Sequence, residues 1–214
     1  MKIGFIGVGK MATAIIQGLK TTSHDIIISG SSLERSKEIG QKLEVDYAQN
    51  HQELIDQSDF VILGIKPQLY ETVLAPLSFK QPVMSMAAGV TIARLEELIG
   101  NHVPLFRIMP NMNAQILKST TALTHNDLVD PALLQAVREM VESFGSCFNI
   151  TEKDFDTFTA LAGSSPAYIF LFIELWPKRA LNMVSQKKLP WKLSVKLYRL
   201  ALYNYYRAKI ALIH

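Results

Sequence analysis

The sequence predicts an α/β protein in which a doubly wound, mostly parallel sheet is followed by a helical region. Short apolar runs alternate with segments of helical spacing over residues 1–150. A glycine-rich turn directly follows the first apolar run, and the strand signals stop after Ile150. With 214 residues, of which 49% are hydrophobic, the chain is long enough to bury a core and too apolar to be disordered.

The elements are expected in alternating order along the chain. The β-branched run Lys2–Ile6 predicts the first strand, and Asp59–Ile65 is so uniformly apolar that a strand buried on both faces is expected. The full set of expected strands is Lys2–Ile6, Asp25–Ser29, Asp59–Ile65, Pro82–Met86, Leu105–Met109, Ser119–Thr124 and Ser146–Ile150. The expected helices between them are Met11–Lys20, Leu33–Leu43, a helix starting at Pro67, Thr91–Leu98 with Thr91 as N-cap, and Asp130–Phe144.

A domain boundary is expected near residue 150, which gives an α/β sheet domain over residues 1–150 and a helical domain over residues 151–214. A helix is expected over Phe155–Leu161. Gly163-Ser164-Ser165-Pro166 should end it and begin another, with Pro166 in the first turn, where proline is tolerated. Pro177 is expected to break this last helix.

The composition changes sharply near residue 175. Residues 1–174 hold 13 Lys/Arg and 19 Asp/Glu, whereas residues 175–214 hold 9 Lys/Arg, no acid and no glycine. No run reaches the roughly 18 apolar residues of a membrane-spanning helix, and the N-terminus does not resemble a signal peptide. The single cysteine, Cys147, fits a cytoplasmic protein and is expected to be a small buried residue.

The turn after the first strand has the pattern G-x-G-x-x-A. It is formed by Gly7-Val8-Gly9-Lys10-Met11-Ala12, and it lies between a strand and a helix. In a dinucleotide-binding Rossmann domain the first glycine permits the tight turn, the second lets the backbone approach a pyrophosphate, and the small third residue lets the helix pack on the strand. A glycine turn without a nucleotide is the weaker alternative, because such pairs are common.

The residues after the second strand favour NADP(H), with NAD(H) also possible. An acid there would bind the ribose hydroxyl of NAD(H), but the sequence has Ser29-Gly30-Ser31-Ser32 with Arg35 close behind. Hydroxyls and a guanidinium suit a 2′-phosphate. Alternatively, Ser32 caps the next helix and Arg35 is a solvated charge.

Further candidate residues follow the other strands of the predicted sheet, at the edge where open α/β sheets bind ligands. Lys66-Pro67 ends the central strand, while Ala87-Ala88-Gly89 and Pro110-Asn111 follow the next two. Small residues there leave room for a nicotinamide ring, and Asn111 could bond an amide or a substrate. The histidines are too dispersed to form a metal site, and His51 is expected on a solvated surface.

Together these motifs resemble pyrroline-5-carboxylate reductase over residues 1 to about 174. The matching blocks are Gly4–Ala12, Lys66-Pro67, Ala87–Ile92, Arg107–Asn111 and Gly163–Tyr168. The resemblance implies reduction of L-1-pyrroline-5-carboxylate to L-proline with NAD(P)H, in a homo-oligomer whose helical domains interlock. It implies cofactor contacts at Ile6, Gly7, Val8, Gly9, Lys10, Met11, at Ser31 or Ser32, and at Asn50, Gly64, Ile65, Lys66 and Pro67. Ala12, Arg35, Ala87 and Gly89 join this set from the residue patterns, Asn111 and Ser164 are the candidate substrate residues, and no catalytic acid or base is identified.

The sequence departs from the family beyond Glu174. Met112-Asn113 replaces Thr-Pro, and Ser165 replaces a glycine, but neither change removes a group that the chemistry needs. After Glu174, however, the Ser-Pro-Gly-Gly-Thr-Thr loop that binds substrate in the family is not found. We hypothesise that a frameshift near codon 175 altered the C-terminal sequence and made the homo-oligomer doubtful.

Several alternatives arise from this departure. One is a catalytically impaired nucleotide-binding remnant that lacks the substrate loop. Another is a 3-hydroxyacid dehydrogenase, although residues 155–174 contain no lysine to serve as its catalytic group. A membrane-surface helix or a nucleic-acid arm would explain the basic tail, but its apolar residues form no single helical face and are too many for a solvated arm. Neither a membrane nor a nucleic-acid partner is therefore expected.

Overall fold

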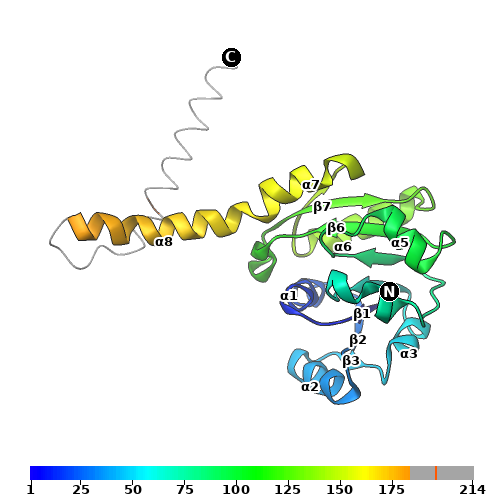
Figure 1. Ribbon diagram of the computed structural model, residues 1–214. Coiled ribbons are helices and arrows are strands. Elements are labelled where there is room, and N and C mark those ends of the chain that lie inside the picture. The colour runs from blue at the N-terminus through cyan, green and yellow to red at the C-terminus, as the bar shows by residue number, and fades with distance from the viewer. Residues whose placement is uncertain (184–195, 197–214) are drawn as a thin grey trace. The chain divides into compact units, whose positions relative to one another are not determined.

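A computed structural model gives the fold, and the residues described are 1–183 and 196. The chain divides into two compact units, residues 1–164 and 165–214 (Figure 1). Predictions made for residues 184–195 and 197–214 lie outside the described residues.

The first unit is built on one eight-stranded sheet with the order β3-β2-β1-β4-β5-β6-β7-β8. All neighbouring strands are parallel except β6 and β7, which pair antiparallel. The order of the first six strands is that of a doubly wound dinucleotide-binding sheet. The sequence predicted a doubly wound sheet but not its strand order. The strands are β1 Lys2–Ile6, β2 Asp25–Ser29, β3 Asp46–Tyr47, β4 Phe60–Leu63, β5 Val83–Ser85, β6 Leu105–Met109, β7 Ser119–His125 and β8 Gly145–Asn149.

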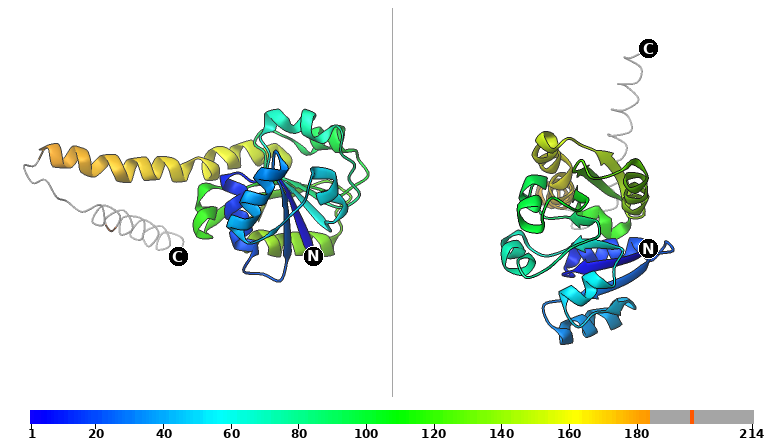
Figure 2. Two further views of the ribbon diagram at one scale, coloured as in Figure 1. Left: turned by 90° about the horizontal axis from the view of Figure 1, so that it is seen from below. Right: turned by 90° about the vertical axis from the view of Figure 1, so that its right-hand side faces the viewer.

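Helices cover both faces of this sheet (Figures 1 and 2). The core on one face includes buried apolar residues of α1, α2 and α6, and the core on the other includes those of α3, α4 and α5. The central strand β4 is buried along its whole length, which explains its uniformly apolar sequence. The helices are α1 Lys10–Leu19, α2 Leu33–Leu43, α3 His51–Asp56, α4 Tyr70–Leu74, α5 Ile92–Ile99 and α6 Pro131–Glu142, with the short helices η1 Pro67–Leu69 and η2 Met112–Ile116.

Side-chain caps set the starts of several helices. The hydroxyl of Ser32 accepts from the backbone of α2, that of Thr91 from α5, and the carboxylate of Asp130 from α6. Pro131 occupies the first turn of α6, where no backbone donor is needed. These polar residues precede apolar helical patterns, which is why the starts could be predicted.

The first unit extends beyond residue 150, where the sequence signals change. After β8 the chain forms η3 Glu152–Asp154, α7 Phe155–Phe158 and a π-helical turn, η4 Thr159–Gly163. Phe155 is fully buried and packs with Met109 and Ala122 of the sheet. This packing joins residues 152–164 to the sheet domain, although they are helical like residues 165–183.

The second unit begins with helix α8, Ser165–Met183, which includes Pro166 near its start as predicted. The predicted break at Pro177 is wrong, because α8 continues to Met183. A proline inside a helix removes one backbone hydrogen bond and costs about 3 kcal/mol, which does not by itself end a helix. Among the described residues, no helix is long and apolar enough to span a membrane.

Candidate cofactor and substrate site

The carboxyl ends of the parallel strands are tied together by backbone hydrogen bonds. The Gly7 N–H donates to the Ser29 carbonyl at 2.8 Å, so the turn after β1 is fixed to the end of β2. On the other side, the Gly64 N–H donates to the Ile6 carbonyl, also at 2.8 Å. The predicted cofactor residues of three strands therefore lie at one edge of the sheet.

The glycines at this edge have distinct roles. Gly7 has φ +83°, and an added Cβ would lie 2.6 Å from Ile65 Cγ2. At Gly64 an added Cβ would lie 2.3 Å from the Gly7 carbonyl oxygen and 3.1 Å from the Ala12 Cβ. Close packing of the two turns thus requires both glycines and the small Ala12. A Cβ on Gly9, by contrast, would meet no protein atom within 4 Å.

Gly9 stands at the N-terminus of α1 and provides no side-chain cap, so first-turn N–H groups remain for a ligand. It borders a groove of about 650 Å³. The lining includes the cations Lys10, Arg35 and Lys42 and no acidic residue. Open space, a helix N-terminus and three positive charges together suit a pyrophosphate. The residues lining the groove are Val8, Gly9, Lys10, Thr13, Ala14, Gln17, Arg35, Lys42 and Gln115.

The residues after β2 have structural roles of their own. Ser32 Oγ accepts from the Arg35 N–H at 3.2 Å, and the Arg35 guanidinium pairs with Glu38 at 2.6 Å. Arg35 nevertheless borders the groove, and its side chain is half exposed. The helix-capping alternative for Ser32 is therefore confirmed, while its contact with a 2′-phosphate stays a prediction.

His51 does not lie where the sequence predicted. It is half-buried rather than on a solvated surface, and its Nδ1 lies 2.7 Å from Ser29 Oγ. Burial lowers the pKa of His51. The preceding Asn50 caps α3, because its Oδ1 accepts from the Glu53 N–H at 2.9 Å. The cap uses the acceptor of Asn50, so its amide nitrogen is the group suited to the predicted cofactor contact.

The start of α4 and the end of β5 are joined through a buried hydroxyl pair. Lys66 is exposed, and Pro67 begins η1 as predicted. Tyr70 Oη lies 2.8 Å from Ser85 Oγ, which also accepts from the Ala87 N–H at 3.2 Å. Burial raises the pKa of Tyr70 to about 12, so this phenol stays neutral. Neither hydroxyl was predicted from the sequence.

The loop after Ala87 then turns at Gly89, which has φ +74° and open space where a Cβ would be. This conformation favours glycine and leaves the loop backbone accessible to a ligand. The predicted role of the loop in lining a nicotinamide site stays a prediction.

Asn111 is held by the protein itself. Its Oδ1 accepts from the Asn113 N–H at 3.1 Å, and its Nδ2 donates to the Ala162 carbonyl at 3.0 Å. The residue is only 4% exposed. This geometry favours a role in fixing the turn before Ser164 over direct substrate contact, whereas Ser164 itself is only partly buried.

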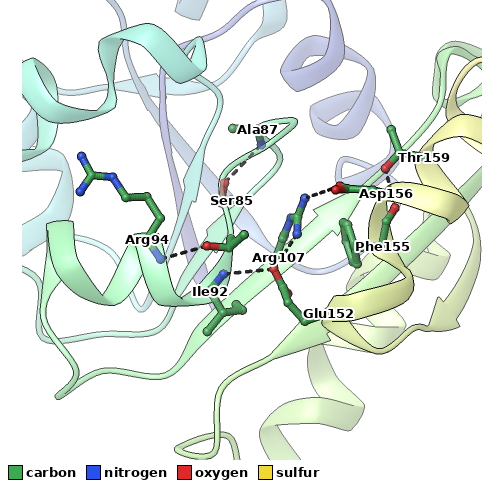
Figure 3. A network of polar contacts seen from close by, with 10 residues as sticks. Ser85, Ala87, Ile92, Arg94, Arg107, Glu152, Phe155, Asp156 and Thr159 are labelled. Carbon is green, nitrogen blue, oxygen red and sulfur yellow. Dashed lines mark hydrogen bonds and ion pairs between the residues drawn. The ribbon is translucent and has the colours of Figure 1, made fainter.

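A buried ion-pair network beside this edge was not foreseen (Figure 3). The Arg107 side chain of β6 is 2% exposed, and its Nη1 lies 2.6 Å from Glu152 Oε1. The guanidinium also lies 4.1 Å from the centre of the Phe155 ring. A single charge inside the apolar run Leu105–Met109 is the sequence signal that could have revealed it.

The described part of the chain supports neither a metal site nor a cysteine nucleophile. Residues 1–183 and 196 contain no group of three or more His, Cys, Asp or Glu placed to bind a metal ion. Cys147 is buried as expected, and burial raises its pKa to about 11, so it is a poor nucleophile.

Comparison with known proteins identifies the family. The family model described as NADP oxidoreductase, coenzyme F420-dependent, matches residues 2–89, and the model for pyrroline-5-carboxylate reductase dimerisation matches residues 152–199. Pyrroline-5-carboxylate reductase of Aquifex aeolicus is 32% identical over 177 residues, which cover 81% of this chain and 66% of the relative. That of Staphylococcus haemolyticus is 32% identical over 196 residues, which cover 87% of this chain and 72% of the relative. The chain belongs to the pyrroline-5-carboxylate reductase family.

Solved structures of this family agree with the fold. Pyrroline-5-carboxylate reductase from Streptococcus pyogenes superimposes with a TM-score of 0.88 at 59% identity, covering 97% of this chain and 79% of that one. The Plasmodium falciparum enzyme, solved with NADP bound, gives a TM-score of 0.80 at 25% identity over 95% of this chain and 76% of that one. The dimerisation match to residue 199 continues past Glu174, where the sequence resemblance was expected to end.

Proposed function

We propose that this chain binds NADP(H) and reduces L-1-pyrroline-5-carboxylate to L-proline as a homo-oligomer. The observation that carries the proposal is the open N-terminus of α1 at Gly9, beside a groove lined by three cations and no acid. The family relationship supplies the substrate, and the structure of a relative with NADP bound supports the choice of cofactor.

The residues fit a dinucleotide phosphate. The N–H groups that follow Gly9 would bind the pyrophosphate, and Lys10 would add positive charge. Ser31, Ser32 and Arg35 would surround the 2′-phosphate, because a guanidinium forms charge-assisted bonds to phosphate. The loops at Lys66-Pro67 and Ala87–Gly89 would border the nicotinamide end.

The nicotinamide, when bound, supplies a hydride to the imine carbon. The protein has to hold the two reactants in contact and to orient them, since the carbon of a protonated imine is already electrophilic. The neutral Tyr70–Ser85 pair and the Asn111 amide act by fixing the loops that carry the site. In this mechanism none of the residues named has to act as a strong acid or base.

The second unit supports assembly into a homo-oligomer. Helix α8 carries several large apolar side chains that are half or more exposed, and an apolar surface of this kind usually marks a protein interface. The region matches the family's dimerisation model. The exposed residues are Tyr168, Leu171 and Phe172, with Phe170 at 49% and Leu175 at 48%.

A second candidate is a cofactor-binding protein without turnover. The composition of residues 175–214, without acid or glycine, favours it, because it departs from that of residues 1–174. Such a protein would bind NADPH at the first unit and leave the imine unreduced.

Two measurements on the 214-residue chain separate these functions. NADPH binding is followed by fluorescence, and NADPH oxidation is followed with pyrroline-5-carboxylate. Binding with turnover supports the reductase, and binding without turnover supports the second candidate. Absence of NADPH binding would contradict both.

A further inference from the structure

We propose that Arg107 and Glu152 form a positioning pair that holds the loop Ala87–Thr91 in place for the cofactor. The inference rests on the proposed function, because it concerns how the nicotinamide end of that site is shaped. Glu152 lies after the sheet has ended, in η3, yet its carboxylate reaches two different elements of the sheet domain (Figure 3).

The first contact is with the sheet. Glu152 Oε1 lies 2.6 Å from Arg107 Nη1, in the middle of β6. Asp156 lies 3.7 Å from the same guanidinium but is 92% exposed, so Glu152 is the principal counter-charge. Phe155 stacks on the guanidinium and is itself fully buried. Through these contacts Arg107 fixes Glu152 and Phe155, at the start of the segment 152–164.

The second contact is with the start of α5. Glu152 Oε1 accepts from the Ile92 N–H at 3.4 Å, next to the cap that Thr91 provides. A carboxylate at a helix N-terminus satisfies a free donor and is favoured by the helix dipole. Because α5 begins directly after the loop Ala87–Thr91, this contact fixes one end of the loop. The other end is fixed at Ala87 by the Ser85 hydroxyl.

The pair is costly as a purely stabilising device. Within the described residues, the buried atoms Arg107 Nε and Glu152 Oε2 have no hydrogen-bond partner. The Arg107 side chain is buried, whereas the Glu152 side chain is 37% exposed. A buried charge whose hydrogen bonds are incomplete is often no more stabilising than packed apolar groups of the same volume. Neighbouring positions in β6 are apolar, so an apolar residue here would complete the core. Such a departure from the local pattern is typical of a functional constraint.

The test compares Glu152→Ala and Glu152→Gln with Glu97→Ala. Glu97 pairs with Arg94 at 2.5 Å on the exposed side of α5, so the control removes an ion pair from the same helix without touching the buried one. Glu152→Gln keeps one side-chain oxygen for Arg107 and Ile92, removes the charge, and replaces the unpartnered Oε2 with an amide nitrogen. Amide hydrogen exchange over residues 87–95 is measured without cofactor, and NADPH affinity is measured by fluorescence.

We expect Glu152→Ala to accelerate exchange over residues 87–95 and to weaken NADPH binding roughly tenfold, within the range for residues that act on a site from a distance. Glu152→Gln should recover part of both effects, and Glu97→Ala should show neither. If Glu152→Ala unfolds, Glu152→Gln carries the comparison.

Two outcomes would overturn the proposal. One is unchanged exchange over residues 87–95 in a destabilised variant, which would make the pair a general structural contact. The other is faster exchange with unchanged NADPH affinity, which would separate the loop from cofactor binding. Failure of the unmodified chain to bind NADPH would instead refute the proposed function, and the exchange comparison would still decide whether Glu152 positions the loop.

Discussion

Gly7 and Gly9 stand two residues apart in one turn, yet the structure constrains them differently. Gly7 has a positive φ, and a Cβ there would collide with the Ile65 side chain, whereas a Cβ at Gly9 would point into empty space. The backbone at Gly9 has φ −87°, which any residue can adopt. The first glycine is therefore required by the fold, whereas the fold does not require the second, which the proposed function assigns to cofactor binding.

Exchanging each glycine for alanine separates these requirements. We expect Gly7→Ala to lower the free energy of unfolding by roughly 1–3 kcal/mol, the usual cost of a strained backbone conformation. Gly9→Ala should leave stability unchanged or raise it by up to about 1 kcal/mol, and should weaken NADPH binding because the methyl group occupies the space of the pyrophosphate. Chemical denaturation and NADPH titration measure the two effects. Unchanged affinity in Gly9→Ala would argue against a cofactor at this turn.

The His51–Ser29 contact gives a pH-dependent prediction. Burial lowers the pKa of His51 in the folded state, so the unfolded chain takes up a proton more readily as the pH falls below about 6.5. The contribution of His51 to stability is thus complete above that pH and is lost as the pH falls toward the folded-state pKa.

We expect His51→Gln to show a smaller loss of stability between pH 7.5 and 5.5 than the unmodified chain. Urea unfolding at a series of pH values measures it. His24 also has a lowered pKa, so His24→Gln is the matched control and should remove a separate part of the dependence. Equal slopes for His51→Gln and the unmodified chain would contradict the assignment.

At the scale of elements, prediction succeeded where a polar or turn residue precedes a regular pattern. The bounds of Asp25–Ser29, Leu33–Leu43 and Leu105–Met109 agree with the structure. The short elements β3 and α3 were missed, because two and six residues are too few to establish a period. The prediction of a break at Pro177 was wrong for a different reason. The rule that proline breaks helices considers one residue and leaves out the free energy that the rest of the helix contributes.

Ser32 offers a prediction at this scale because it caps α2 and is also a predicted cofactor residue. Ser32→Ala should destabilise the protein by ~1 kcal/mol, whereas Ser32→Gly should cost only a few tenths, since glycine is an acceptable N-cap. Both variants lose the hydroxyl, so both should weaken NADPH binding to a similar degree. Thermal unfolding and NADPH titration of the two variants measure these effects. If NADPH binding weakens only in the less stable Ser32→Ala variant, Ser32 acts through the helix cap and not through a contact of its hydroxyl with the cofactor.

At the scale of the whole molecule, the sequence predicted a doubly wound sheet but not the packing between distant segments. Arg107 and Glu152 are 45 residues apart, and Ser29 and His51 are 22 apart, so no local pattern joins them. The hypothesis of a frameshift near codon 175 is not supported by the dimerisation match, which continues to residue 199. Translation of the coding DNA in its other two frames tests it, and failure to find Ser-Pro-Gly-Gly-Thr-Thr there would remove its basis.

Helix α8 carries the last prediction, which concerns assembly. Phe170 and Leu171 are 49% and 52% exposed in the single chain, so burying them against a second copy would remove apolar surface from water. We expect the double variant Phe170→Ser, Leu171→Ser to shift the protein toward monomer in sedimentation velocity. Its NADPH affinity should persist, since the residues proposed to bind the pyrophosphate and 2′-phosphate lie in the first unit.

Leu128→Ser is the control for this variant, because Leu128 is 48% exposed in the first unit. It should leave the oligomeric state unchanged, since its exposure lies outside the segment that matches the dimerisation model. Comparison of the two variants distinguishes a specific interface from general apolar association. Equal shifts in both, or no shift in the α8 variant, would contradict assembly through α8 and would leave its exposed aromatic residues to be explained by another partner.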